Sequence, residues 1–121
     1  MSSYIIKWRP DSLISRFEKH ADELCVSVIT AAELRFGAER VQRPKLTVLV
    51  EVLERLAILD WTDAVIHHYA RLRSTLEKTG TSIGNMDLLI AAHAMSEGST
   101  LVTNNTKHFT QVPGLKLEEW K

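Results

Sequence analysis

Net charge is the first thing that the sequence lacks. Fifteen Lys and Arg residues are balanced by fifteen Asp and Glu residues, so the formal net charge at pH 7 is +0. A protein without excess charge generates no large electrostatic field, and it therefore cannot hold nucleic acid or an anionic membrane without specificity. Any contact with RNA must be local.

Cysteine is scarce, and long apolar runs are missing from the sequence. The one cysteine, Cys25, lies in the apolar run 24–28, which predicts a buried and reduced thiol rather than a catalytic one. No stretch approaches the roughly twenty apolar residues of a membrane span, and the N-terminal residues do not contain the apolar core of a signal peptide. We therefore expect a cytoplasmic protein.

Proline and glycine are also few. The chain has three prolines and five glycines, while 45% of its residues are hydrophobic, which is the composition of an ordered protein. Its 121 residues leave no room for a second core of any size, so residues 1–121 are predicted to form a single domain.

The histidines do not follow the ligand spacing of a zinc site. His67, His68, His93 and His108 match no zinc signature with Cys25, so zinc is not expected. His93 is instead expected to pack or cap on its own helix.

Apolar periodicity divides the chain into alternating helices and strands. Unbroken apolar and β-branched runs predict buried strands over 24–29, 58–61 and 100–103, with a short last strand before Trp120. Helical spacing predicts helices over 11–24, 30–41, 46–56, 62–79 and 86–96. Because parallel strands need crossover connections that helices supply, this alternation favours an α/β fold with a parallel sheet covered on both faces.

The helix over 62–79 has the clearest stripe. It is predicted to begin at the capping residue Thr62 and to end at Gly80, where a left-handed conformation is favoured. Its inner face is predicted to consist of Val65, Ile66, Tyr69, Leu72 and Leu76.

Polar side chains stand where predicted strands and helices meet. Glu33 follows the strand 24–29, Asn104 and Asn105 follow the strand 100–103, and Asp87 begins the helix 86–96. In parallel sheets, ligands collect outside the carboxyl ends of the strands, so these groups are expected to converge there. Carboxylate and amide oxygens suit Mg²⁺ or Mn²⁺, which can activate water and neutralise charge on a phosphodiester.

Each of these residues also has a purely structural interpretation. Thr30 and Glu33 fit a capping box, in which the two side chains satisfy backbone N–H groups at a helix start. Asp87 would be stabilised by the positive end of its helix dipole. Asn104 and Asn105 would form a turn. The spacing alone does not decide between the metal-binding and the structural interpretation of these residues.

The ordered series of motifs resembles a known family. Segments 83–94, 101–105 with Phe109, and 112–115 resemble the C-terminal half of VapC-type PIN-domain toxins, and 27–39 resembles the segment that carries the family's second acid. The resemblance covers essentially the whole chain. It implies a PIN-like parallel sheet flanked by helices and an Mg²⁺-dependent (or Mn²⁺-dependent) endoribonuclease toxin of a type II toxin–antitoxin system.

The resemblance also implies roles for residues and partners. Glu33 and Asp87 would be the metal-site acids, Asn105 would take a position where many relatives carry Asp, and Asn104 or Asn105 would orient the attacking water. The run Thr103-Asn104-Asn105 resembles the subgroup that cuts initiator tRNA in its anticodon loop. A homodimer is implied, and so is a cognate antitoxin that wraps the toxin and blocks the acids with its C-terminal segment.

Surface contacts have weaker signals. Arg35, Lys107 and His108 are the residues expected to touch the RNA backbone, although scattered basic residues are also common as solvated surface. The apolar faces that carry Phe17 and Phe36 fit either a groove for a partner peptide or ordinary core.

The N-terminal residues depart from the family pattern. PIN domains open with a central strand that ends in an Asp-bearing motif, and nothing here matches it. Residues 3–7 look like the segment just after that motif, while Asp11 follows Pro10 and is typical of a helix cap. We therefore expect the first strand and the first metal-site acid to be missing, which would leave neighbouring strands unpaired in the interior.

Three outcomes follow from this departure. The chain is an endoribonuclease, a catalytically impaired module that binds antitoxin or itself without cutting RNA, or a fragment that does not fold alone. Two carboxylates and neutral amides hold Mg²⁺ more weakly than three or four carboxylates, which favours impairment.

Overall fold

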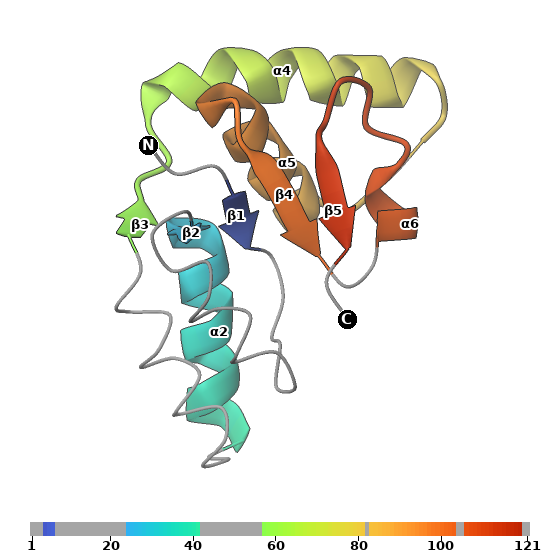
Figure 1. The fold of residues 1–121 in the computed structure, drawn as a ribbon. Helices are drawn as coiled ribbons and strands as arrows, with labels where there is room; N and C mark the ends of the chain where they lie inside the picture. The colour runs from blue at the N-terminus through green and yellow to red at the C-terminus, as the bar shows by residue number, and fades with distance from the viewer. Residues whose placement is uncertain (1–3, 7–23, 42–56, 82, 104–105, 120–121) are drawn as a thin grey trace.

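The computed structural model describes residues 4–6, 24–41, 57–81, 83–103 and 106–119. Its strands are β1 (Tyr4–Ile6), β2 (Leu24–Ser27), β3 (Ala57–Leu59), β4 (Thr100–Thr103) and β5 (Leu117–Glu119). Its helices are α2 (Val28–Val41), α4 (Asp63–Lys78), α5 (Asn85–Glu97) and α6 (Thr106–Phe109). Figure 1 shows their arrangement. The helices expected over 11–24 and 46–56 lie outside the described residues.

The strands form one parallel sheet in the order β3-β2-β1-β4-β5. The α/β fold with a parallel sheet is therefore confirmed. Its centre is β1, where Ile5 pairs with Cys25 of β2 on one side and with Leu101 of β4 on the other.

The prediction that the central strand of the sheet is missing is wrong. We predicted unpaired neighbours there, but Tyr4–Ile6 pairs with both β2 and β4. The physical reason is that a β-prone Tyr-Ile-Ile segment can satisfy the backbone N–H and C=O groups that both neighbours present. The departure from the family motif stands in the sequence, because Lys7, Trp8 and Arg9 follow this strand in place of an acid.

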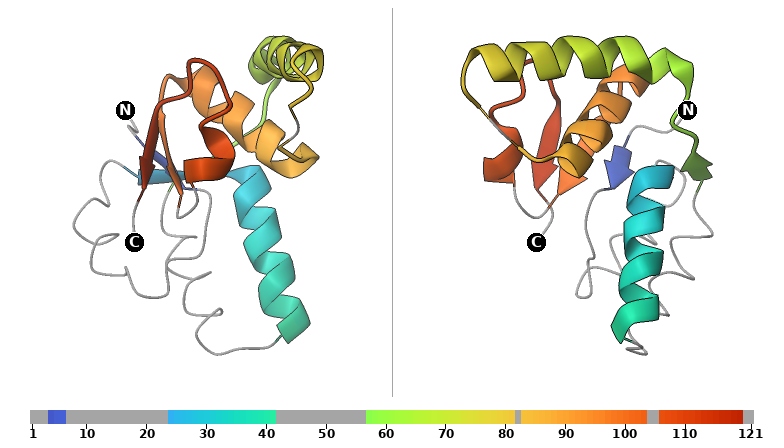
Figure 2. Two further views of the ribbon diagram at one scale, coloured as in Figure 1. Left: turned by 90° about the vertical axis from the view of Figure 1, so that its right-hand side faces the viewer. Right: turned by 180° about the vertical axis from the view of Figure 1, so that it is seen from behind.

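Helix α5 is the centre of the core. Its residues Ile90 to Ala94 are all buried. Ile90, Ala91 and Ala94 pack in one cluster with Leu72 and Leu76 of α4 and with Cys25 and Leu101 of the sheet. A helix that is apolar all round is typical of such a buried position. Helices α2, α4 and α5 lie to the same side of the sheet, with α4 packed against α5 (Figure 2).

Helix α4 has the stripe that its sequence predicts, with one correction. Val65, Leu72 and Leu76 are buried, but Ile66 is 54% exposed, so its placement on the inner face was wrong. Ile66 is the next residue after Val65, and one helical step of about 100° turns it away from the core. Gly80 has φ 71° just beyond the helix, as predicted from its place in the sequence.

Helix α2 begins earlier than expected. We placed the strand over 24–29 and the helix start at Thr30, whereas β2 ends at Ser27 and α2 begins at Val28. The Ser27 hydroxyl accepts the backbone N–H of Ile29 at 3.2 Å, which stabilises a helix start at this point. The run 24–29 is apolar or β-branched at nearly every position, so its pattern does not show where the strand ends and the helix begins.

The described helices are short. None of those within the described ranges is long and apolar enough to cross a membrane.

The packing of α4 generates a stability prediction. Leu72→Ala removes a buried side chain that is 4% exposed, and it should lower the free energy of unfolding by about 2–5 kcal/mol. Ile66→Ala on the exposed face is the control and should change it by about 0.5 kcal/mol or less. Urea unfolding followed by circular dichroism measures both, and equal losses would contradict the packing described here.

Candidate functional site

The carboxyl edge of the sheet is where the two predicted acids are carried. Helix α2 starts at the carboxyl end of β2. Helix α5 leads into β4 through the left-handed turn at Gly98, so it runs back across the sheet and its first turn lies toward the same edge. The two helices contact each other. Glu33 and Asp87 therefore lie on packed helices that both start at this edge.

One carboxylate oxygen of Glu33 is not used in the local structure of the described residues. The side chain is half-buried, and its Oε1 is buried without a hydrogen-bond partner among the described residues. The capping-box account is wrong, since Thr30 is the third residue of α2 and its buried Oγ1 also makes no hydrogen bond within the described part of the chain. Buried oxygens without a partner cost free energy, and bound cations or water relieve this.

Asp87 is the third residue of α5 and is half-buried in its first turn. The residue before this helix is Gly84, with φ 85° and no side-chain cap. A carboxylate here is stabilised by the helix dipole, as the structural account expected. The same position also presents it toward the edge where Glu33 lies, so both accounts of Asp87 are compatible with the structure.

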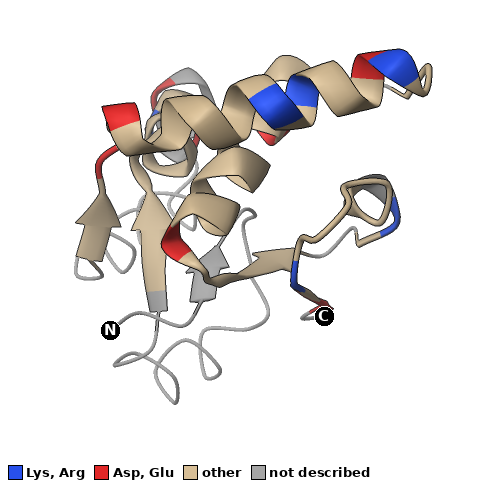
Figure 3. Cartoon of the chain, turned by 90° about the horizontal axis from the view of Figure 1, so that it is seen from above, with Lys and Arg blue, Asp and Glu red and all other residues tan. Residues whose placement is uncertain are grey.

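The structure gives less support to the other predicted site residues. Asn104 and Asn105 lie outside the described residues, although Thr103 before them ends β4 and is buried. Arg35 and Lys107 are exposed, on α2 and α6, and His108 also lies in α6. Figure 3 marks basic residues along α4 and, separately, in the C-terminal segment.

The donor set fits a hard divalent cation but is small. Glu33 and Asp87 are oxygen donors of the type that Mg²⁺ and Mn²⁺ accept. Within the described ranges, no group of three or more His, Cys, Asp or Glu side chains gathers around one point. The described part of the chain therefore offers two carboxylates, one of them with an oxygen that has no other bond.

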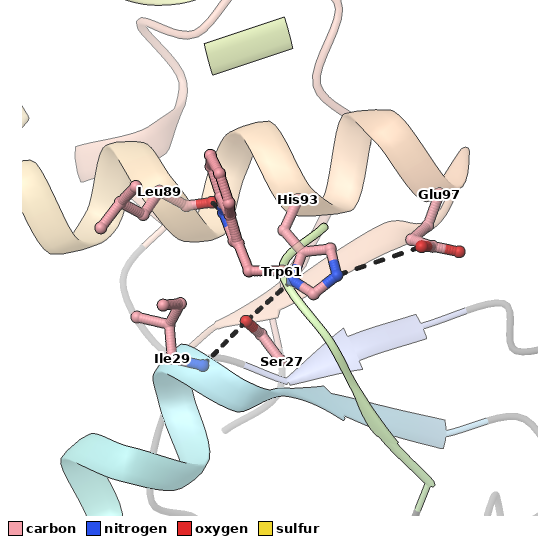
Figure 4. Close-up of polar contacts among 6 residues, drawn as sticks. All are labelled: Ser27, Ile29, Trp61, Leu89, His93 and Glu97. Carbon is pink, nitrogen blue, oxygen red and sulfur yellow. Dashed lines mark hydrogen bonds and ion pairs between the residues drawn. The ribbon is translucent and has the colours of Figure 1, made fainter. Parts of the chain in front are cut away.

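Ser27 and His93 form a buried polar contact that sequence reasoning missed. His93 Nδ1 lies 2.9 Å from Ser27 Oγ, and both side chains are 0% exposed (Figure 4). Burial lowers the pKa of His93, against the opposing effects of the Glu97 charge and the Asp60 backbone, so the ring is neutral at pH 7. The expectation that His93 packs is confirmed, but nothing in the sequence pairs it with Ser27.

Comparisons with known proteins agree with this geometry. The family model described as "PIN domain" matches residues 2–115. Ribonuclease VapC2 of Haemophilus influenzae is 44% identical, and the tRNA(fMet)-specific endonuclease VapC of Shigella flexneri is 38% identical; each match covers 97% of this chain and 90% of the relative.

Solved structures of complexes extend the similarity to the fold. DNA-bound VapBC from Salmonella typhimurium matches with a TM-score of 0.88 at 32% identity, over 100% of both chains. VapBC2 from Rickettsia felis, bound to a promoter DNA fragment, matches with a TM-score of 0.84 at 36% identity, over 98% of both chains. With a parallel sheet and these relatives, the chain belongs to the PIN-domain family, in its VapC-type branch.

Proposed function

We propose that the chain is a metal-dependent endoribonuclease toxin that cuts initiator tRNA in its anticodon loop, with Glu33 and Asp87 as the acids that hold Mg²⁺ or Mn²⁺. The observation that carries the proposal is the buried Glu33 Oε1, which makes no hydrogen bond in the described residues and lies on a helix packed against the one that bears Asp87. The tRNA(fMet)-specific relatives, at 38% and 36% identity, support the substrate.

The roles of the residues follow from their positions. Glu33 and Asp87 bind the cation from α2 and α5, and the bound cation supplies water activation and charge neutralisation at the phosphodiester. Arg35 and Lys107, both exposed, contact the RNA backbone locally, which suits a chain without net charge. Asn104 and Asn105 follow the buried end of β4 and orient the water.

A second function is favoured by one observation. No acid directly follows β1 in the sequence, because the next three residues are Lys7, Trp8 and Arg9. A chain with two metal-site carboxylates binds Mg²⁺ weakly, and it would then act by binding an antitoxin or another copy of itself.

The antitoxin is proposed to bind over α2. Phe36 is 65% exposed and lies three residues after Glu33 on the same helix. Residues at this spacing are neighbours on a helix surface, so an apolar partner segment that covers Phe36 also covers the acid. The similarity to chains of solved VapBC complexes supports such a partner.

Asp87→Asn tests the catalytic assignment. It should reduce cleavage of tRNA by at least ~100-fold, because loss of a ligand weakens a cation that contributes several kcal/mol to the reaction. Asp63→Asn is the control, since Asp63 is likewise an acid in the first turn of its helix, α4. Cleavage of end-labelled initiator tRNA, measured under single-turnover conditions, should be unchanged in the control. If the two variants behave alike, Asp87 has only its helix-dipole role.

Metal removal separates the two functions. Treatment with EDTA should abolish cleavage by the unmodified chain, and addition of Mg²⁺ or Mn²⁺ should restore it, while circular dichroism shows the fold intact. Cleavage that persists in EDTA would contradict the metal-dependent reaction. Absence of cleavage with every RNA and cation, together with co-purification of the antitoxin, would favour the binding module.

Phe36→Ala tests the partner surface. It should weaken antitoxin binding by roughly 10-fold or more, as expected for a large aromatic anchor. Cleavage in the absence of antitoxin should not change. Ile66→Ala, which removes an exposed aliphatic side chain from α4, serves as control. Calorimetric titration with the antitoxin C-terminal segment gives both affinities, and an unaltered affinity for Phe36→Ala would place the partner elsewhere.

A further inference from the structure

The contact between Ser27 and His93 joins the two helices that carry the acids. Ser27 is the last residue of β2, and its hydroxyl accepts the N–H of Ile29 in the first turn of α2 at 3.2 Å. The same hydroxyl lies 2.9 Å from His93 Nδ1 in α5. One buried oxygen therefore bonds to the start of α2 and to the middle of α5 (Figure 4).

The chemistry of the hydroxyl allows both bonds at once. A serine hydroxyl has one hydrogen and two acceptor positions. It accepts the hydrogen of Ile29 N–H and still has its own hydrogen to donate to an unprotonated Nδ1 of His93. Because burial keeps the imidazole of His93 neutral, this arrangement needs no buried charge.

The contact lies among apolar residues of α5, and Glu97 and Asp60 are the charged residues that act on the His93 ring. His93 is flanked on α5 by the buried residues Ile90, Ala91, Ala92 and Ala94. Burial of a hydroxyl and an imidazole in such a core costs about 1–3 kcal/mol for each group that lacks a partner. His93 Nε2 has no hydrogen bond within the described residues and lies 4.0 Å from Glu97 Oε1. An apolar side chain would fill the same space equally well. The polar pair therefore indicates that a hydrogen bond is needed here to orient α2 and α5.

The position of the contact relates it to the acids. Ser27 lies six residues before Glu33, and His93 lies six residues after Asp87. Between Asp87 and His93, the backbone oxygen of Leu89 accepts a hydrogen bond from Trp61 Nε1 at 3.0 Å. Helix α5 is thus held at Leu89 and at His93 by two hydrogen bonds from side chains of residues that are distant in the sequence.

We propose that Ser27 and His93 are positioning residues, whose hydrogen bond fixes the start of α2 against α5 and thereby holds Glu33 and Asp87 at the separation that a divalent cation requires. The inference rests on the proposed function for the identity of the acids. The buried pair thus affects metal affinity, although neither residue touches the metal or the RNA.

The test measures Mn²⁺ binding to the full chain by electron paramagnetic resonance, beside kcat and KM for tRNA cleavage. Ser27→Ala and His93→Leu each remove the bond, and each should weaken Mn²⁺ binding by about 10-fold, as loss of a supporting hydrogen bond typically does. The value of kcat should fall by a similar factor with KM unchanged. His93→Asn keeps a polar atom where Nδ1 lies and should return Mn²⁺ affinity to within about 3-fold of the unmodified chain.

Ser99→Ala is the matched control, because Ser99 is a buried serine beyond the other end of α5. It should lower the thermal midpoint, as Ser27→Ala does, but it should not change the Kd for Mn²⁺.

Two results overturn the proposal. One is unchanged Mn²⁺ affinity in both Ser27→Ala and His93→Leu with a lowered thermal midpoint, which would show a packing role alone. The other is absence of Mn²⁺ binding by the unmodified chain. If the unmodified chain binds Mn²⁺ but cuts no RNA, the proposed function fails while the affinity comparison still decides the role of Ser27 and His93.

Discussion

Parallel pairing along both sides of Tyr4–Ile6 is the interaction on which the rest of the structure depends. This strand holds β2 and β4 in one sheet, so the carboxyl ends of both strands face the same edge. Helix α2 leaves β2 at that edge, and the start of α5 lies toward it. Helices α2 and α5, which carry Glu33 and Asp87, start toward one edge because three central residues satisfy the backbone groups of both neighbours.

Helix α5 links this edge to the core. Its small residues Ala91, Ala92 and Ala94 are fully buried and allow it to pack both on the sheet and against α4. The first turn of the same helix carries Asp87, so the placement of a charged group depends on apolar packing several residues away. A change in that packing would therefore affect the acidic edge without altering any acid.

The sequence predicted some of these features because their signals are local. The strand 100–103 and the helix that begins near Met86 stand out as unbroken apolar segments, and Gly80 and Gly98 mark helix ends. The central strand β1 was missed because residues 3–7 resemble the family segment that follows the first strand, and this resemblance was preferred to their β-prone composition.

The site was predictable only in part, for a related reason. Residue types suggested Glu33 and Asp87, but whether the Glu33 carboxylate is used in a cap depends on where α2 begins. That start is set by the Ser27 hydroxyl, whose other contact, His93, is 66 residues away in the sequence. Sequence spacing cannot relate Ser27 to His93, because the two residues meet only when α5 packs on the sheet.

The two outer strands have a consequence for association between molecules. β3 and β5 are each three residues long, and β5 carries Glu118 and Glu119. A short strand offers few backbone groups to another chain, and adjacent carboxylates would repel a second copy aligned beside them. The outer strands of the described sheet therefore offer a poor surface for strand addition by another chain.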